Sequence, residues 1–562
     1  MCGAWWGRAL GWVLTVCWII AVRMRYAGQL VASGGVLFDV EGFARMCRVS
    51  RLFGTGLWVL KRNDHEGWPL GVDGAGSTLS DHLLWVVAWA IRCTGMAIER
   101  VDERLGVVLR AGALDYGGGL FSLLVGLSVA GAMLWWVRRQ EFGRFGFVGW
   151  LIFISLPPLV FATRFAALDE SVFGLLFLCW ALIFADTGWC SSGWRAVVGG
   201  AMAGASLWVA PRFAGPVILL IMTLRGLRSG SRKGVVDSLG WWAVGVVLVL
   251  GCACWLDGAA WCQPLVSSGA GRWHDTLGLW RRVEEGGAPW LWFGGMVLIP
   301  CLALVFGMSG FPERALNLFR SVAALAAIVA SWAMPVWAPV AVVLVLMCAP
   351  AAVRGSKKIV GDVRYRMLLQ GRGVRRLCAV GAAMLFFWPI ARWWDGWLYP
   401  SDHRATEALE YREEMAQLRR VAHGLRGGEV QPFLAPWYLS PAVCYWSMQP
   451  AVSSFTLMNP EGLEFAVKFY SSPDPSGLRD ALFARGVRWI ICDAPDRFER
   501  NVRRLRFDLP SQDSAVHVLR RGRNVTVSHG FERAFTTGTF VVVEPFAAAV
   551  PSKQAPSAIN ED

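Results

Sequence analysis

Two carboxylates, Asp39 and Glu41, stand two residues apart directly after the first apolar run of the chain. Oxygen ligands with this spacing can meet a hard divalent cation, either Mg²⁺ or Mn²⁺. A second acidic pair, Asp169-Glu170, lies at the start of a later apolar run, and a third, Glu284-Glu285, lies in the longest polar gap. Three such groups at one membrane surface would repel one another unless a cation or a positive partner lay among them. We therefore predict that the three pairs build one metal-centred site.

Each acidic pair taken alone has a simpler explanation. Solvated carboxylates at a helix end account for Asp39 and Glu41, and an acidic helix start accounts for Asp169-Glu170. Arg164, five residues before Asp169, has the chemistry to neutralise the acids or to clamp a phosphate. An arginine whose side chain extends along the membrane interface accounts for it equally well. The metal-site hypothesis therefore requires that the three pairs share one side of the membrane.

The composition is that of a membrane protein. The chain has 562 residues, of which 55% are hydrophobic and 17% charged, with a mean hydropathy of +0.43. A soluble chain carries about 25% charged residues. Apolar runs long enough to cross a bilayer recur from residue 9 to residue 396, which predicts a polytopic α-helical protein.

The charge distribution orients the predicted spans. The net charge of +14 comes from Arg and Lys that cluster between apolar runs, notably in 225–233 and 354–376, as the positive-inside rule requires. Nucleic-acid binding is therefore not needed to explain it. With these loops inside and about eleven spans, the tail and all three acidic pairs lie outside. Residues 79–98 are apolar but contain Asp81, His82 and Arg92. We interpret them as a surface or re-entrant helix, because a further span would put the first acidic pair opposite the second.

The predicted domains follow from this count. Residues 1–398 form the transmembrane domain, with external loops at 38–106 and 257–289. The second external loop contains Asp257 and the third acidic pair. Residues 399–550 predict a soluble α/β domain on the outer face, and 551–562 a disordered end. In this domain we expect helices at 403–425 and 476–485 and strands at 432–435, 487–492, 514–519 and 539–544. The expected location is the inner membrane, with an extracytoplasmic C-terminal domain.

Other residues of the outer side leave alternatives open. Arg392-Trp393-Trp394-Asp395 ends the last predicted span, where it can anchor the span at the interface or let Arg392 contact a lipid phosphate. Cys444 and Cys492 lie in the external domain, where one disulfide is possible, although the sequence does not decide it.

The order of these features resembles the catalytic subunits of oligosaccharyltransferases, which belong to the GT-C class of glycosyltransferases. The shared order is an acidic pair after the first span, a long external loop, Arg and then Asp before the fourth span, and Glu in a later external loop. The resemblance covers nearly the whole chain, and each motif is degenerate. The segments that carry it are Glu41-Gly42-Phe43 with Arg45, Trp68-Pro69-Leu70-Gly71, Ser77-Thr78-Leu79, Leu168-Asp169-Glu170-Ser171, and the stretch from Trp437 through Tyr445-Trp446-Ser447.

This resemblance implies roles for the candidate residues. The donor would be a polyprenyl-linked sugar or oligosaccharide, transferred with inversion on the outer face and with the lipid phosphate leaving. A divalent cation would orient the reactants, and a carboxylate would activate the acceptor. The implied metal ligands are Asp39, Glu41, Asp169 and Glu170. The implied catalytic residues are Glu41, Asp169, Glu284 and Glu285, and Glu284 or Glu285 would complete the metal site and contact the acceptor. The phosphate contacts are Arg164 and Arg392, and the acceptor contacts are Trp437 and Tyr438.

Two departures from the family pattern bear on these roles. Ser171 occupies the place of the second carboxylate of the Asp169 motif. Tyr438 occupies the place of the Asp that would read the hydroxyl of an Asn-x-Ser/Thr acceptor. The acceptor therefore stays open between a protein side chain, a glycan and a lipid.

Two other classes of function fit the composition. A lipid or oligosaccharide transporter (flippase) would carry ionisable residues at mid-membrane depth and an internal repeat, whereas the acidic pairs lie at span ends. A non-catalytic envelope scaffold would leave the three acidic pairs far apart. The distances among the acidic segments separate the scaffold from the enzyme.

Overall fold

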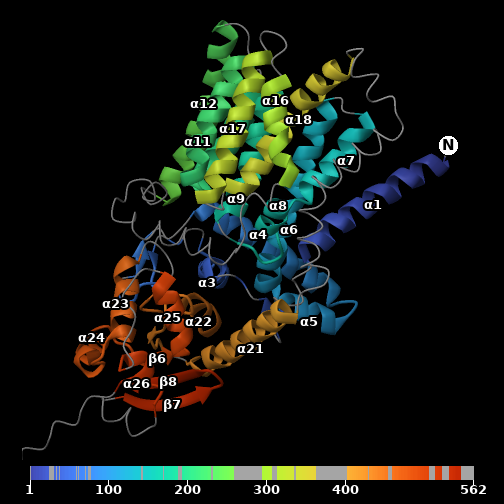
Figure 1. Ribbon diagram of the computed structural model, residues 1–562. Coiled ribbons are helices and arrows are strands. Elements are labelled where there is room, and N and C mark those ends of the chain that lie inside the picture. The colour runs from blue at the N-terminus through green and yellow to red at the C-terminus, as the bar shows by residue number, and fades with distance from the viewer. Residues whose placement is uncertain are drawn as a thin grey trace, which may run out of the picture. The chain divides into compact units, whose positions relative to one another are not determined.

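The chain forms two compact units, each of which is described by itself (Figure 1). Unit 1 comprises Met1–Lys61 and Gly74–Arg412, and unit 2 comprises Arg62–Asp73 and Glu413–Asp562. The computed structural model describes residues 2–24, 31–32, 35–36, 38, 40–57, 60, 62–69, 71–73, 77–140, 143–168, 170–187, 193–228, 232–257, 294–306, 313–333, 337–361, 402–427, 429–453, 459–504, 513–521 and 531–545.

Unit 1 is almost entirely helical. A short antiparallel hairpin, β1 (Val31–Ala32) with β2 (Gly35–Val36), is its sheet in the described ranges. Its helices are α1 (Cys2–Met24), α3 (Val40–Thr55), α4 (Thr78–Ile98), α5 (Glu103–Ala111), α6 (Ala113–Arg139), α7 (Gly143–Ile154), α8 (Pro157–Ala162), α9 (Glu170–Thr187), α10 (Gly193–Val209), α11 (Pro211–Arg228), α12 (Arg232–Asp257), η3 (Gly294–Val297), α16 (Leu298–Phe306), α17 (Glu313–Ala333) and α18 (Trp337–Gly361).

Proline and glycine divide several of the predicted spans. The apolar run over 107–137 breaks at Gly112 into α5 and α6. The apolar run over 146–164 breaks before Pro157-Pro158 into α7 and α8, because proline suits the first positions of a helix and removes a backbone hydrogen bond from its interior. Pro211 likewise begins α11, with one residue between it and the end of α10.

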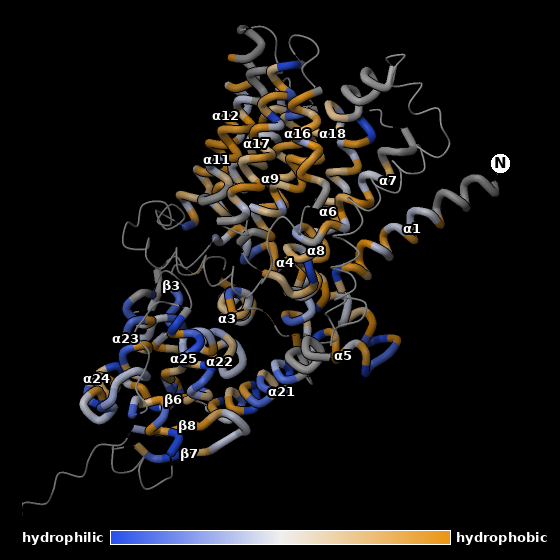
Figure 2. Tube along the Cα trace, viewed as in Figure 1, coloured by the Kyte–Doolittle hydropathy of each residue, from blue (hydrophilic) through white to orange (hydrophobic). Residues whose placement is uncertain are grey.

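Several helices of unit 1 are apolar enough for a bilayer. Three are also long enough to cross it, namely Ala113–Arg139, Leu239–Asp257 and Arg314–Ser331, and four shorter apolar segments accompany them: Leu10–Met24, Val172–Asp186, Ala214–Thr223 and Trp337–Ala352. Figure 2 shows the apolar residues along α9, α11, α12 and α17. Residues 79–98 form the single helix α4, and the last predicted span, at 377–396, lies outside the described residues. The number of spans therefore stays a prediction.

Close backbone contact holds α10 against α12. A Cβ added at Gly200 would overlap the carbonyl oxygen of Trp242, and one added at Gly245 would overlap the carbonyl oxygen of Val197. Small residues at such crossings let two helices approach closely in a membrane, where packing replaces the hydrophobic effect as the driving force.

Unit 2 is an α/β fold around a four-stranded sheet of order β5-β6-β8-β7. Strand β5 pairs with β6 in parallel, and the other pairs are antiparallel. Its elements after the short hairpin described next are α21 (Asp402–Gly424, in unit 2 from Glu413 onward), β5 (Phe433–Leu434), α22 (Ser440–Ser447), α23 (Pro460–Ser471), η4 (Ser476–Leu478), α24 (Arg479–Ala484), β6 (Trp489–Cys492), α25 (Pro495–Arg504), α26 (Ala515–Val518), β7 (Phe531–Thr537) and β8 (Phe540–Pro545).

One predicted strand of unit 2 is wrong. Residues 514–519 contain the short helix α26, with Ser514 at its N-cap position. Ala515, Val516, Val518 and Leu519 are all buried, and this i, i+1, i+3, i+4 pattern suits a helix rather than a strand.

Unit 2 also includes a piece of the first loop. Residues Arg62–Asp73 form the hairpin of β3 (Arg62–Asn63) and β4 (Val72–Asp73). Ala451 N donates to His65 O at 2.8 Å, Trp68 N donates to Ala451 O at 3.1 Å, and Trp68 Nε1 donates to Arg485 O at 2.9 Å. Segments that fold into one unit occupy one aqueous compartment. The first loop and the tail therefore lie on the same side of the membrane, which requires an even number of crossings between them.

Candidate functional site

Glu41 lies in the first turn of α3 and is half-buried. The helix that follows it is buried from Gly42 to Ser50, so its position is fixed by packing. Among the described residues no group of three or more His, Cys, Asp or Glu side chains could hold a metal ion. Several predicted site residues lie outside the described residues, namely Asp39, Asp169, Glu284, Glu285 and Arg392, and the side chain of Glu170 is not described.

Arg45 joins the first turn of α3 to two other helices. It is buried, lies one turn after Glu41, and donates from Nη1 to Ser80 Oγ of α4. The same Nη1 lies 3.8 Å from Asp81 Oδ1. The guanidinium carbon lies 4.6 Å from the ring centroid of Phe173 on α9. Residues four apart share a helix face, so Glu41 lies on the face of α3 that meets the beginnings of α4 and α9.

The loop before α9 is fixed by its backbone. Phe165 N donates to Arg23 O at 3.0 Å, and Ala166 N donates to Gly119 O at 3.2 Å. Arg23, itself buried, donates from Nε to Thr163 Oγ1 at 2.7 Å. Ala166 adopts a positive φ of 65°, which an L-residue keeps only where the surroundings enforce it. The segment that leads into Asp169 is therefore held against α1 and α6.

Arg164 belongs to this loop and is half-buried. Its guanidinium carbon lies 3.7 Å from the ring centroid of Phe161, an exposed side chain. The cation therefore rests on an aromatic face near the surface of unit 1, a position that leaves its hydrogen-bond donors open to an anion.

The start of the third acidic segment is tied to α4. Asp257 ends α12 and directly precedes residues 258–293. Its Oδ2 accepts from Thr78 N at 3.2 Å and from Trp208 Nε1, and its Oδ1 accepts from Thr78 Oγ1. Helices α3 and α12 thus contact α4 directly. Helix α9 contacts Arg45, which α4 binds.

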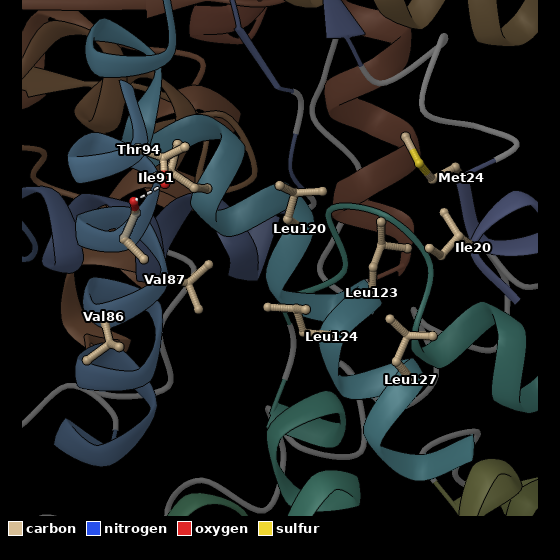
Figure 3. Close-up of a pocket in the computed structure, with 11 residues that line it drawn as sticks. Ile20, Met24, Val86, Val87, Ile91, Thr94, Leu120, Leu123, Leu124 and Leu127 are labelled. Carbon is tan, nitrogen blue, oxygen red and sulfur yellow. Dashed lines mark hydrogen bonds between the residues drawn. The ribbon is translucent and has the colours of Figure 1, made fainter. Parts of the chain in front are cut away.

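An apolar groove lies elsewhere on unit 1, between α1, α4 and α6 (Figure 3). It encloses about 400 Å³ and is lined by Ile20, Met24, Val86, Val87, Ala90, Ile91, Thr94, Leu120, Leu123, Leu124 and Leu127. Its one hydroxyl, that of Thr94, donates to Ala90 O at 2.8 Å. Leu120 and Leu124 line the groove, whereas Phe121 stacks on Phe173 at a centroid distance of 4.6 Å. The groove therefore lies on another face of α6 and supplies no group for chemistry.

Trp437 and Tyr438, the predicted acceptor contacts, lie in the core of unit 2. Their exposed fractions are 2% and 8%. Tyr438 Oη donates to Asp493 Oδ2 at 2.7 Å. Burial raises the pKa of Tyr438 well above its usual value, and burial also raises the pKa of Asp493, although Arg497 Nη1 at 3.4 Å opposes that rise. Packing and this hydrogen bond account for both residues.

A substitution distinguishes the core role of Tyr438 from an acceptor contact. We expect Tyr438→Phe to lower the free energy of unfolding by about 1–3 kcal/mol, because it removes the hydroxyl that donates to the buried Asp493 Oδ2. The variant should keep the acceptor KM of the wild type. Thermal unfolding and acceptor titration measure the two effects, and a raised KM with unchanged stability would support the acceptor contact instead.

The disulfide considered for Cys444 and Cys492 is not formed. Cys492 is a free thiol on β6, and burial raises its pKa to about 12. Cys444 Sγ donates to His65 O at 3.5 Å, so this thiol helps to hold the first-loop segment within unit 2.

The helical unit with its α/β companion has the fold of the GT-C membrane glycosyltransferases. The archaeal oligosaccharyltransferase AglB from Archaeoglobus fulgidus, in complex with an inhibitory peptide and a dolichol-phosphate, is similar over 88% of this chain and 70% of its own, with a TM-score of 0.60 and 12% identity. ArnT from Cupriavidus metallidurans, bound to undecaprenyl phosphate, is similar over 96% of this chain and 99% of its own, with a TM-score of 0.52 and 14% identity. No protein-family model and no curated protein sequence matches the chain. The resemblance to the oligosaccharyltransferase fold is thereby confirmed.

Proposed function

We propose that the protein is a multi-pass membrane glycosyltransferase that transfers a sugar or oligosaccharide from a polyprenyl-phosphate-type lipid to an envelope acceptor. One observation carries this proposal. Arg45, one turn after Glu41, rests on Phe173 in the first turn of α9, and Asp169 directly precedes that helix in the sequence. The start of α3, with Glu41, therefore lies close to the start of α9, as one catalytic site requires and as a scaffold does not.

The proposed ligands suit a hard divalent cation in their chemistry, since all are carboxylates and one of them, Glu41, is half-buried at a helix start. Asp39, Glu41 and Asp169, with Glu170 beside them, would hold Mg²⁺ or Mn²⁺, and Glu284 or Glu285 would complete the site. The bound ion would supply Lewis-acid polarisation and a template for donor and acceptor.

The residues of the chain supply the remaining chemistry. Arg164, resting on Phe161, would bind the donor phosphate, and Arg392 would add a second contact. The acceptor would attack the anomeric carbon from the face opposite the phosphate, which inverts its configuration. Its proton would pass to Glu284 or Glu285, while the anomeric C–O bond breaks and its electron pair leaves with the lipid phosphate.

The donor class has further support. Two similar structures contain a dolichol-phosphate and an undecaprenyl phosphate. Asp257 ends a long apolar helix, and α9 contains a shorter apolar segment, Val172–Asp186, so a lipid-linked donor would reach the site without leaving the bilayer. We place the site and unit 2 on the extracytoplasmic side of the inner membrane, in line with the basic loops on the other side.

The flippase alternative draws on a buried ionisable pair, Asp186 with Arg320. Both side chains are fully packed, and Asp186 lies at the end of α9. A closed ion pair of this kind between helices holds them together and offers no pathway for a substrate. The observation favours the enzyme.

Mass spectrometry of envelope glycoproteins and glycolipids, with and without the gene, tests the proposed function. We expect at least one glycoconjugate to lose its sugar when the gene is deleted and to regain it when the wild-type gene is restored. Restoration by the Glu41→Ala variant would contradict the assigned site. An unchanged glycan profile, together with a lipid-linked sugar that stays on the inner leaflet, would support the flippase.

A further inference from the structure

The first turn of α4 contacts two of the helices that lie beside the acidic pairs, α3 and α12. It runs from Thr78 to Asp81, and Thr78, Ser80 and Asp81 are all buried. Thr78 binds Asp257 at the end of α12 through both its amide and its hydroxyl. Ser80 and Asp81 bind α3. Three residues of one helix thus contact the elements beside the first and third acidic segments.

Charge is concentrated at this contact. Arg48 Nε donates to Asp81 Oδ2 at 3.3 Å, and Arg45 Nη1 lies 3.8 Å from Asp81 Oδ1. Arg45, Arg48 and Asp81 are 3%, 6% and 5% exposed. A buried ion pair is retained where it fixes an arrangement, because apolar side chains of similar volume would stabilise the fold as well.

Arg45 connects this contact to the start of α9, which follows the second acidic pair in the sequence. Its guanidinium joins Ser80 and Asp81 on one side and the ring of Phe173 on the other. Its orientation is thus set by α4, and its stacking fixes α3 against the first turn of α9. A planar guanidinium suits this double role, and the ammonium group of lysine does not.

We propose that Asp81 and Arg45 are positioning residues of the glycosyl-transfer site. Asp81 holds Arg45 and Arg48 in place, and Arg45 holds the first turn of α3, with Glu41, against the start of α9. The inference rests on the proposed function and deepens it, since neither residue touches donor or acceptor. Both act by fixing the start of α3, which carries Glu41, relative to the start of α9.

The other end of α4 offers a matched control. Glu99 Oε2 lies 3.2 Å from Arg110 Nη1, in an ion pair that is partly exposed. It joins the end of α4 to α5, away from α3 and α9. Breaking it removes one ion pair from the same helix without touching the candidate site.

The test uses the full-length protein in detergent and Mn²⁺ alone as the probe. We measure the melting temperature at increasing Mn²⁺ for the wild type and for Asp81→Asn, Arg45→Lys, Glu99→Gln and Glu41→Gln. A bound ion raises the melting temperature of the native state. We expect Asp81→Asn and Arg45→Lys to need about 10-fold more Mn²⁺ for the half-maximal rise. Glu99→Gln should match the wild type, and Glu41→Gln should lose the response.

The outcomes separate the inference from the proposed function. A wild type without a Mn²⁺ response contradicts the metal site and the inference together. A wild-type response that Asp81→Asn and Arg45→Lys retain at the same Mn²⁺ concentration overturns the inference and leaves the proposed function standing. If Asp81→Asn shows no folded baseline, Arg45→Lys decides, because it keeps the buried positive charge. Sugar transfer in membranes should also fall in Asp81→Asn and Arg45→Lys. The kcat should decrease, whereas the donor KM should change less.

Discussion

Removal of the Glu41 carboxylate is expected to lower sugar transfer by about 100-fold or more. Glu41 is the predicted metal ligand whose side chain the structure describes, at the first turn of α3. Glu41→Gln keeps the volume and the hydrogen-bonding capacity of the side chain while it removes the charge that a divalent cation requires. Asp169→Ala should have an effect of the same size. Transfer of labelled sugar from the polyprenyl-linked pool of isolated membranes measures both variants.

The control must separate a metal ligand from an ordinary acidic helix start. Glu103 serves for this purpose, because it lies in the first turn of α5 and is exposed. Its carboxylate interacts with the helix dipole as that of Glu41 does, a contribution of about 0.3–1 kcal/mol. Glu103→Gln should therefore leave transfer unchanged. Undiminished transfer by both Glu41→Gln and Asp169→Ala would show that neither acid is needed for transfer and would favour the interpretation as solvated carboxylates at helix ends.

The sequence predicted much of unit 1 because its signals are local. Apolar runs and basic loops each depend on a few neighbouring residues, whereas the break before Pro157 divides a run predicted as one span. The GT-C resemblance could likewise be found from the order of acidic motifs along the chain. The apolar runs can be recognised in the sequence because a bilayer imposes the same length and polarity on every span.

The contacts between distant segments could not be predicted in the same way. The sequence gives no sign that residues 62–73 pair with the tail. Their bonds to Ala451 join backbone atoms, and the indole of Trp68 donates to a backbone carbonyl, that of Arg485. Arg45 was noted as part of a motif, but its stacking on Phe173 joins residues 128 positions apart (173 − 45). Trp437 and Tyr438 were assigned from a family position, and burial in the core of unit 2 is decided by packing that no single motif encodes.

The role of Asp81 in α4 is also hidden from the composition. Residues 79–98 are apolar with Asp81, His82 and Arg92 as interruptions, and the count of membrane sides predicted a surface or re-entrant helix. In the structure, Asp81 is buried against two arginines, so it is part of the arrangement of α3 and α4 rather than an interruption. A charge that weakens a span by composition can thus mark the place where a site is assembled.

Breaking the buried pair of Asp186 and Arg320 is expected to destabilise unit 1 by about 3–5 kcal/mol. Arg320 donates to Asp186 Oδ1 from Nη2 and from Nε, the latter at 2.9 Å, and Trp136 Nε1 donates to Asp186 Oδ2 at 2.7 Å. Asp186→Ala removes the common acceptor of α6 and α17 and leaves a buried cation without its carboxylate. Equilibrium unfolding of the full-length protein in detergent measures the loss.

The double variant Asp186→Leu/Arg320→Met is the informative control for this pair. It removes both charges and restores apolar volume, so we expect it to recover most of the stability that Asp186→Ala loses. Trp136→Phe should cost only about 1 kcal/mol beyond packing, because the carboxylate keeps its arginine. If Asp186→Ala unfolds at the wild-type free energy, the pair does not hold α9 to α17. A double variant that stays folded but loses transfer would instead give the pair a functional role, and the flippase hypothesis would then regain its main structural support.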